Sequence, residues 1–364
     1  MISEIVLACH LDGSALGDLT SAVQFGFIIG TLIFAILTIA DRFSPSKVFM
    51  ISALFGALSN LGVTWDGNSL LSLLTFRFFT GFFLAGIYPV GMKIAADYFD
   101  KGLGKSLGFL VGALVIGTAF PHLLKDVAVS FPWQYVLYAT SGLAVLGGSL
   151  MFLLVPDGPY RRESQKTDLS AFLDVFKDSQ FRSVAFGYLG HMWELYAFWT
   201  FVPIILGTYS LANPSANINI PLLSFFVIAI GGIACMLAGY ISQSAGAKKP
   251  AFLALLFSCI CCLISPFILE STSTFLFVAF LIFWGSVVIA DSPLFSTLVA
   301  KNAVPEMKGT ALTIVNCLGY AVTIVSIQLL SALHAYTDSS VIYVLLALGP
   351  IVGLFSLSKY RSTA

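Results

Sequence analysis

The sequence predicts an all-α integral membrane protein with two helical bundles related by a parallel repeat, and three observations lead to this fold class. Eleven long apolar stretches, separated by short loops, fill the 364-residue chain. Hydrophobic residues make up 58% of it and charged residues only 10%, whereas soluble domains carry about 25% charged residues. Lysine and arginine gather in every second loop. A soluble protein of this composition would lack the polar surface to cover itself.

Each apolar stretch is expected to be a helix, because in lipid every backbone amide must bond within its own segment. A bilayer core of about 30 Å needs roughly 20 helical residues to cross it. Residues 2–9 form an apolar stub that is too short to cross. The expected spans are 16–40, 48–63, 70–91, 104–124, 133–155, 181–209, 221–245, 251–269, 274–299, 309–332 and 341–357.

Basic residues predict the orientation of these spans. One alternate set of loops holds 16 of the 18 Lys and Arg residues, whereas the opposite set holds only Lys125. Since basic loops face the cytoplasm, we expect this set and the C-terminus to be cytoplasmic, in a bacterial inner membrane. No signal peptide is recognisable at the N-terminus.

The connection 156–180 is the longest and most charged, and it divides the chain. We expect an N-terminal bundle over residues 1–155, a cytoplasmic linker over 156–180 and a C-terminal six-helix bundle over 181–364. Within the linker, apolar residues recur at helical spacing, which indicates either a short helix on the membrane surface or a solvated linker. These apolar residues are Leu169, Phe172, Leu173 and Phe176.

An internal repeat supports this division. Shifting the chain by 204 residues superimposes Gly81 on Gly285 and Pro89 on Pro293. The same shift maps Met1 onto Ile205, near the outer end of the span 181–209, so most of the first helix of the N-terminal bundle is expected to be missing. Two parallel six-helix repeats are typical of one large class of transporters.

Three motifs resemble those of the major facilitator superfamily. Asp41 and Arg42, in the loop Ala40-Asp41-Arg42-Phe43-Ser44-Pro45-Ser46-Lys47, match its signature between helices two and three. Arg77 with Gly81 matches the arginine motif of its fourth helix. The glycines at 108, 112 and 117 keep the spacing of the antiporter motif in its fifth helix, but Ala113 and Ile116 replace its proline and one of its glycines.

The resemblance implies two bundles that rock between inward-open and outward-open states around a site at their interface. It would place Asp41 against the N-terminus of the helix that starts at Gly309, where a carboxylate is favoured. We therefore expect Asp41 and Arg42 to act in gating, the alternative being an ordinary polar loop. The departures at Ala113 and Ile116 argue against drug antiport.

Ionisable residues at membrane depth are candidate functional residues, because an ion there costs about 3 kcal/mol or more. Arg77 lies about 10 Å deep, at 1.5 Å per residue. Since it keeps its charge, it needs an anionic solute or partner in the cavity, or else a structural pairing. The presence of Arg77 is a weak indication of an anionic substrate.

His191 and Glu194 are three residues apart and share one helix face. This pair is a candidate proton site, and polar packing between helices is the alternative. Asp291 precedes Ser292-Pro293, where the proline predicts a kink; it either faces the cavity or pairs near the cytoplasmic end. Weaker candidates are His122, expected at the membrane interface, and the hydrogen-bonding residues Asn316 and Gln328.

Small residues complete the prediction. The glycines expected at close helix contacts, either on sliding surfaces or on fixed packing faces, are Gly81, Gly86, Gly108, Gly112 and Gly117. The cysteines fall in apolar stretches without metal-ligand spacing, and the cluster at 259–262 is expected to be small core residues. We expect neither a metal nor a cofactor.

The sequence therefore predicts a secondary active transporter that moves a small solute by alternating access, with a proton as candidate coupling ion in symport. Efflux of apolar compounds is the alternative within the transporter class. A non-transporting receptor is the alternative from another class, and no nucleophile–base spacing or phosphate loop indicates an enzyme. We expect a monomer in the lipid bilayer, and the net charge of zero gives no sign of a nucleic-acid partner.

Overall fold

The computed structural model describes residues 2–12, 14–99, 103–127, 132–161, 174–303 and 308–360. These residues form helices joined by turns, and the described part contains no strand. Within the described residues, ten helical segments are long and apolar enough to cross a membrane, which confirms the predicted fold class. The eleventh predicted span is α4, an 18-residue helix that packs against α5 and α8.

The first half of the chain contains α1 (Ile2–Ala8), α2 (Ala15–Ile36), α3 (Ile39–Arg42), α4 (Pro45–Gly62), α5 (Leu70–Leu84), α6 (Tyr88–Tyr98), α7 (Leu103–Val127) and α8 (Gln134–Leu154). The second half contains η2 (Asp174–Lys177), α9 (Ser179–Ala212), η3 (Pro214–Ala216), α10 (Ile220–Ala245), α11 (Lys248–Leu269), α12 (Thr274–Ala290), α13 (Ser292–Asn302), α14 (Lys308–His334), η5 (Ser340–Ala347) and α15 (Leu348–Lys359). Residues 162–173, which include most of the apolar positions of the linker, lie outside the described residues.

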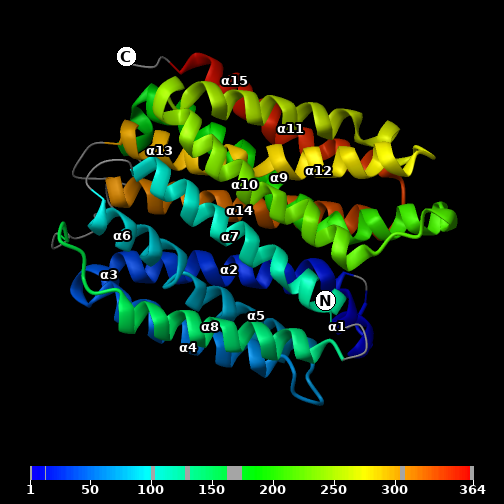
Figure 1. Cartoon of the computed structure of the whole chain (residues 1–364), viewed down its shortest axis with the longest axis horizontal. Coiled ribbons are helices and arrows are strands. Elements are labelled where there is room, and N and C mark those ends of the chain that lie inside the picture. The colour runs from blue at the N-terminus through cyan, green and yellow to red at the C-terminus, as the bar shows by residue number, and fades with distance from the viewer. Residues whose placement is uncertain are drawn as a thin grey trace.

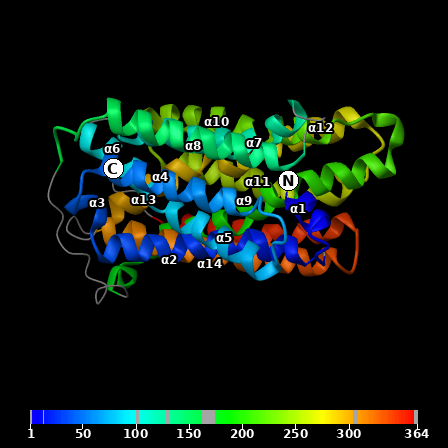
Figure 2. The ribbon, with the colours of Figure 1, turned by 90° about the horizontal axis from the view of Figure 1, so that it is seen from below.

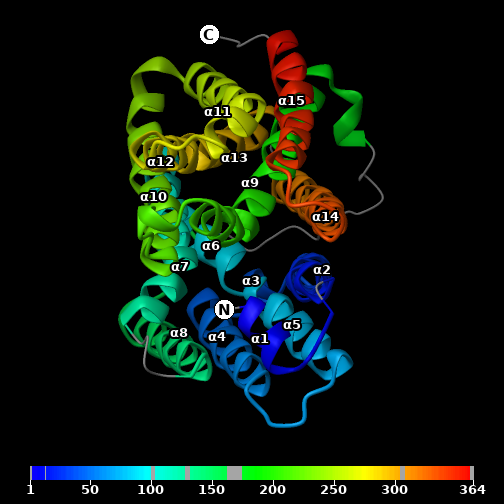
Figure 3. The same cartoon turned by 90° about the vertical axis from the view of Figure 1, so that its right-hand side faces the viewer.

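The long helices run side by side along the longest axis of the molecule (Figure 1). Seen end-on, α1–α8 and α9–α15 form two groups (Figure 3). The groups meet along two seams, where α7 packs against α10 and α2 against α14. Figure 2 shows α7 and α10 near one edge of the molecule and α2 and α14 near the other. An interface between the halves thus runs from one seam to the other.

Two of the expected spans are broken helices. The span 70–91 consists of α5 and α6, separated at residues 85–87, and the span 274–299 consists of α12 and α13, separated at Asp291. In each pair a proline, Pro89 or Pro293, occupies the second position of the later helix, where its missing N–H costs nothing. The kink expected at Asp291 is therefore present, whereas the break at 85–87 was not expected.

Packing follows the 204-residue repeat in detail. A Cβ on Gly81 would overlap the carbonyl oxygen of Val23, and a Cβ on Gly285 would overlap that of Val227. Both pairs are related by the same shift, and so are the serines that cap α5 and α12, Ser69 and Ser273. The two halves therefore use the same helix contacts, α2 with α5 and α10 with α12.

Glycines also bring the halves together at the seam of α7 and α10. A Cβ on Gly112 would lie 2.9 Å from the carbonyl oxygen of Gly232, and one on Gly108 would lie 3.2 Å from that of Cys235. Gly86 faces Ser52 in the same crowded way within the first half. Gly117 is different, because a Cβ there would meet nothing within 4 Å among the described residues, so no close helix contact is seen at this glycine.

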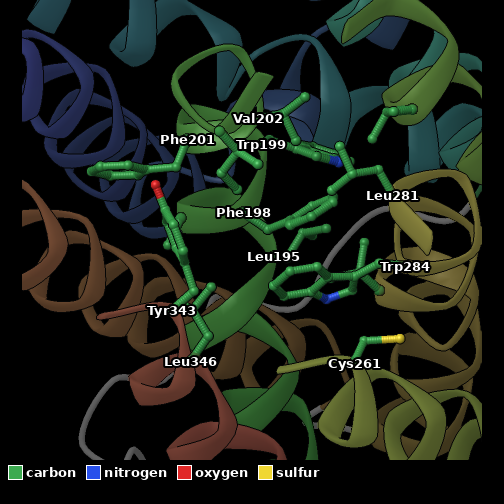
Figure 4. Close-up of a cluster of buried hydrophobic side chains, with 14 of the residues drawn as sticks. Leu195, Phe198, Trp199, Phe201, Val202, Cys261, Leu281, Trp284, Tyr343 and Leu346 are labelled. Atoms are coloured by element: carbon green, nitrogen blue, oxygen red, sulfur yellow. The ribbon is translucent and has the colours of Figure 1, made fainter. Parts of the chain in front are cut away.

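The core of the second half is rich in aromatic side chains from α9 and α12. Phe198 and Trp284 lie with ring centroids 4.6 Å apart, and Leu195 and Leu281 pack around them (Figure 4). These side chains are buried. They form the contact between α9 and α12, and α9 also carries the polar residues described next.

Candidate functional site

Helix α9 directs two ionisable side chains into the core of the second half. His191 and Glu194 are each only 1% exposed. They lie near the middle of a 34-residue helix, one turn apart and therefore on neighbouring parts of one face. The predicted pair is thus buried between helices of one half.

His191 meets Asp291 at the break between α12 and α13. Its Nδ1 lies 2.8 Å from Oδ1 of Asp291, which is also 1% exposed. The contact is an ion pair when the imidazole is protonated. Among the described residues, His191 Nε2 and Asp291 Oδ1 have no hydrogen-bond partner. The structure therefore brings together two of the predicted residues and leaves unsatisfied capacity on both.

Glu194 accepts three contacts on one carboxylate oxygen. Its Oε1 lies 2.5 Å from Ser258 Oγ, 2.6 Å from Trp284 Nε1 and 3.2 Å from Cys262 Sγ. Ser258 and Cys262 come from α11, and Trp284 comes from α12. Cys262 therefore acts as a polar contact, and no cluster of metal ligands exists among the described residues.

Two carboxylates and one imidazole thus share a dry environment. If all three were ionised, the cluster would carry one negative charge in excess, and an uncompensated buried charge is costly. Taking up one proton balances that charge. The arrangement can therefore hold a proton inside the second half and exchange it when solvent reaches the cluster.

Next to this cluster, aromatic side chains from both halves meet at the interface. Tyr188 on α9 donates a hydrogen bond of 2.8 Å to Asn316 on α14, and the hydroxyls of Tyr196 and Tyr320 are 2.8 Å apart. Phe27 of α2 lies against Tyr320, with ring centroids 4.3 Å apart. We call these five residues the interface cluster. It mixes rings, hydroxyls and one amide.

Two neighbours extend the interface cluster. Tyr88, the first residue of α6, packs against the same core. Trp199 packs edge-on against Tyr196, with ring centroids 5.2 Å apart, and it is only 5% exposed. Its indole N–H has no partner among the described residues. A buried donor without an acceptor is unusual, and a bound solute can satisfy it.

Of the interface cluster, only Asn316 was predicted from the sequence, as a weaker candidate that forms hydrogen bonds between helices, and its bond to Tyr188 is of this kind. One signal could have indicated the rest of the cluster, because tyrosines are enriched at the membrane–water boundary and not at mid-depth. Tyr188, Tyr196 and Tyr320 stand well inside apolar helices. They therefore mark a polar region in the middle of the membrane.

Arg77 occupies a separate place on α5. It is half-buried, and its Nε donates a hydrogen bond of 3.4 Å to the carbonyl of Leu19 on α2. Among the described carboxylates, none lies within ion-pair distance of Arg77, and the structure shows no contact between Arg77 and His191 or Asp291. His122 is half-buried near the end of α7.

The gating residues are described only in part. Arg42 is the last residue of α3 and is exposed, while the side chain of Asp41 and residues 304–307 lie outside the described residues. Gln328 on α14 joins the two halves near the N-terminal end of α2. Its Nε2 lies 3.1 Å from both Asp18 Oδ1 and Ser21 Oγ. Asp18 was missed by the sequence analysis, although an acidic residue in the first turn of an apolar helix is a visible signal.

Known proteins share this architecture. The crystal structure of a mutant of the nucleoside transporter NupG is similar, with a TM-score of 0.72 over 99% of this chain and 94% of that one, at 16% sequence identity. The bicyclomycin resistance protein homolog of Haemophilus influenzae is 25% identical over 143 residues. That similarity covers 38% of this chain and about a third, 34%, of the relative.

The family profile extends much further along the chain. The profile of the Major Facilitator Superfamily matches residues 1–327. The match includes the whole first half and the second half as far as residue 327, within α14. The chain therefore belongs to the Major Facilitator Superfamily and is a membrane transporter, not an enzyme.

Proposed function

We propose that this chain is a secondary active transporter that binds a small solute at the interface cluster and moves it by alternating access. The observation that carries the proposal is that Phe27 of the first half packs against Tyr320 of the second half in this cluster, while Trp199, which packs against Tyr196 of the same cluster, has an indole N–H without a described partner. A solute held between two bundles is exposed to one side or the other when the bundles rock. Residues 1–155 and 181–364 would be the moving bodies.

The chemistry of the interface cluster favours a solute with a flat apolar part and hydrogen-bond acceptors. Aromatic rings stack against flat surfaces, and the tyrosine hydroxyls and the indole N–H can donate hydrogen bonds. Arg77, for which no described carboxylate is an ion-pair partner, lies apart from the interface cluster and is proposed as a separate point of contact for an anionic group on its way through the transporter. The similar solved structure is that of a nucleoside transporter, and a nucleoside is a solute of this flat polar kind.

Coupling to protons is part of the proposal. Tyr188 belongs to the interface cluster, and its ring lies 6.1 Å from that of His191, so the interface cluster and the buried charges are neighbours. Protonation of Asp291 or Glu194 would remove the excess negative charge of the buried residues. Release of that proton would restore the negative charge. Since Asp291 occupies the break between α12 and α13, a change in its charge acts where this helix bends most readily.

Uptake into proteoliposomes tests this function. A solute found by growth and uptake profiling of a deletion strain should accumulate when the outside is made acidic, and Asp291→Asn and Glu194→Gln should lose that dependence while still binding the solute. The matched control is Asp338→Asn, an exposed carboxylate outside the cluster. Uptake that ignores an imposed pH gradient in the wild type would exclude proton coupling.

Export of apolar compounds is the second candidate. The similarity to a bicyclomycin resistance protein homolog favours it, although Ala113 replaces the proline of the antiporter motif. A strain that overproduces this chain should then tolerate higher drug concentrations than a strain carrying the Trp199→Ala variant. Equal susceptibility across a drug panel would exclude this candidate.

We also propose that the chain is a monomer in a bacterial inner membrane, with its basic loops and C-terminus in the cytoplasm. The one-sided distribution of lysine and arginine supports the orientation. The variants Asp66→Cys and Lys249→Cys, at opposite ends of the helices and in a Cys9→Ser background, test the orientation. A membrane-impermeant maleimide applied to whole cells should label position 66 and leave position 249 unlabelled.

A further inference from the structure

A second site lies on the flank of the molecule, outside the interface cluster. It is a crevice of about 480 Å³ between α2, α5 and α14. Figure 3 shows α2 lying between the other two helices. The volume falls within the range of small-molecule sites, about 300–1,000 Å³. Because α14 belongs to the second half, both halves form the walls.

The crevice contains one charged side chain, Asp18, in the first turn of α2. Its only described polar partner is the neutral amide of Gln328, at 3.1 Å. Among the described residues, no lysine, arginine or histidine lies within ion-pair distance of this carboxylate. The site therefore offers a negative charge that a cation can match.

Apolar side chains continue the crevice toward the middle of the membrane. Phe25 is seven residues after Asp18, which places it about 10 Å deeper at 1.5 Å per residue. The rings of Phe25 and Phe78 lie with centroids 5.8 Å apart, and Leu74 and Ile324 complete this part of the wall. An occupant thus meets a carboxylate at one end and hydrocarbon below it.

The crevice opens toward lipid. Phe25 is 53% exposed although it belongs to a membrane-spanning helix. On α5, Thr75 and Phe78 share a face with Leu71, which is 74% exposed. Exposed apolar side chains at this depth face acyl chains. Asp18 lies at the end of α2 that is far from the basic residues Arg42 and Lys47, so it lies near the headgroups of one leaflet.

We propose that this crevice binds an aminophospholipid, with Asp18 pairing to the ammonium group of the headgroup and the two phenylalanines packing against the upper part of an acyl chain. The charge of Asp18 matches the ammonium group, and its position near the headgroups matches the depth of that group. The lipid-facing apolar opening matches the acyl chain. A cation without a tail would leave the apolar part empty, and an anionic lipid would meet the carboxylate.

Native mass spectrometry of the full-length protein in a neutral detergent tests this inference. Phosphatidylethanolamine should bind the wild type about threefold to tenfold more tightly than phosphatidylglycerol. Asp18→Asn should abolish that preference. The matched control, Asp12→Asn, changes an exposed carboxylate just before α2 that does not line the crevice, and it should keep the preference.

Two further measurements keep the outcome decisive. Ala22→Trp fills the crevice but retains Asp18, so it should weaken the binding of both lipids. Free ethanolamine, which has the ammonium group without a tail, should not displace the lipid. If Asp18→Asn keeps the preference while melting at the temperature of the wild type, or if ethanolamine displaces the lipid at equal concentration, the inference is wrong. Neither result bears on solute transport.

Discussion

Replacing either of two repeat-related glycines by alanine should destabilise the protein to a similar extent. Gly81 faces the backbone of Val23, and Gly285 faces the backbone of Val227. A backbone carbonyl cannot rotate away as a flexible side chain can, so the added methyl group must push two packed helices apart. Because the contacts are related by the 204-residue repeat, the two variants report on the same arrangement in each half.

The magnitude follows from two opposing terms. Alanine is intrinsically better than glycine in a helix by about 1 kcal/mol. Overpacking of a close contact costs about 1–3 kcal/mol. The matched control is Gly117→Ala, because the added methyl group has no neighbouring atom within 4 Å among the described residues. This variant therefore shows only the gain in helix propensity. The overlap cost is the difference between each variant and this control, about 1–3 kcal/mol.

Thermal unfolding in detergent measures this difference. Gly81→Ala and Gly285→Ala should melt several degrees below Gly117→Ala, with shifts that agree within about a factor of two. Gly117→Ala should melt at or slightly above the temperature of the wild type. If Gly81→Ala or Gly285→Ala melts as high as the control, the close approach of the helices is wrong. If one glycine tolerates alanine and the other does not, the halves do not share this contact.

Four other substitutions test the site and the caps. Trp199→Phe removes an N–H that has no described partner, so solute uptake should fall about fivefold or more while the melting temperature stays near that of the wild type. Trp284→Phe removes a 2.6 Å hydrogen bond to Glu194 and should destabilise the protein by about 1.5–3 kcal/mol, because the acceptor is a carboxylate; denaturant titration measures this loss. Ser69→Ala and Ser273→Ala each remove a helix N-cap and should cost about 1 kcal/mol apiece by the same titration, with unequal costs counting against equivalent capping.

The spans could be predicted from the sequence because hydrophobic length alone determines them. The prediction of 251–269 corresponds to α11, Lys248–Leu269, and that of 181–209 corresponds to α9, Ser179–Ala212. The break before Tyr88 was not predicted, although Pro89 follows it directly in the first turn of α6. A proline in the first turn of a helix and a proline inside a helix look the same in the sequence.

The partners of the site residues were harder to predict than the residues themselves. His191, Glu194 and Asp291 were recognisable because ions are rare at membrane depth. In the structure His191 contacts Asp291, whereas Glu194 accepts contacts from three donors on α11 and α12. These partners follow much later in the chain, so the sequence pattern around α9 does not indicate them. Apart from Asn316, the interface cluster was missed for the same reason, since the hydroxyls of Tyr196 and Tyr320 meet across 124 positions.

The two halves share their packing but differ in their chemistry, and this difference bears on how the protein works. The 204-residue shift aligns the helix breaks, the glycine contacts and the capping serines, yet it places Ile87 where the second half has Asp291. The break between α5 and α6 forms with Ile87 at the equivalent position, so a helix break of this kind does not require a carboxylate. We therefore infer that Asp291 serves something other than the bend, and its contact with His191 favours a role in the exchange of charge within the second half.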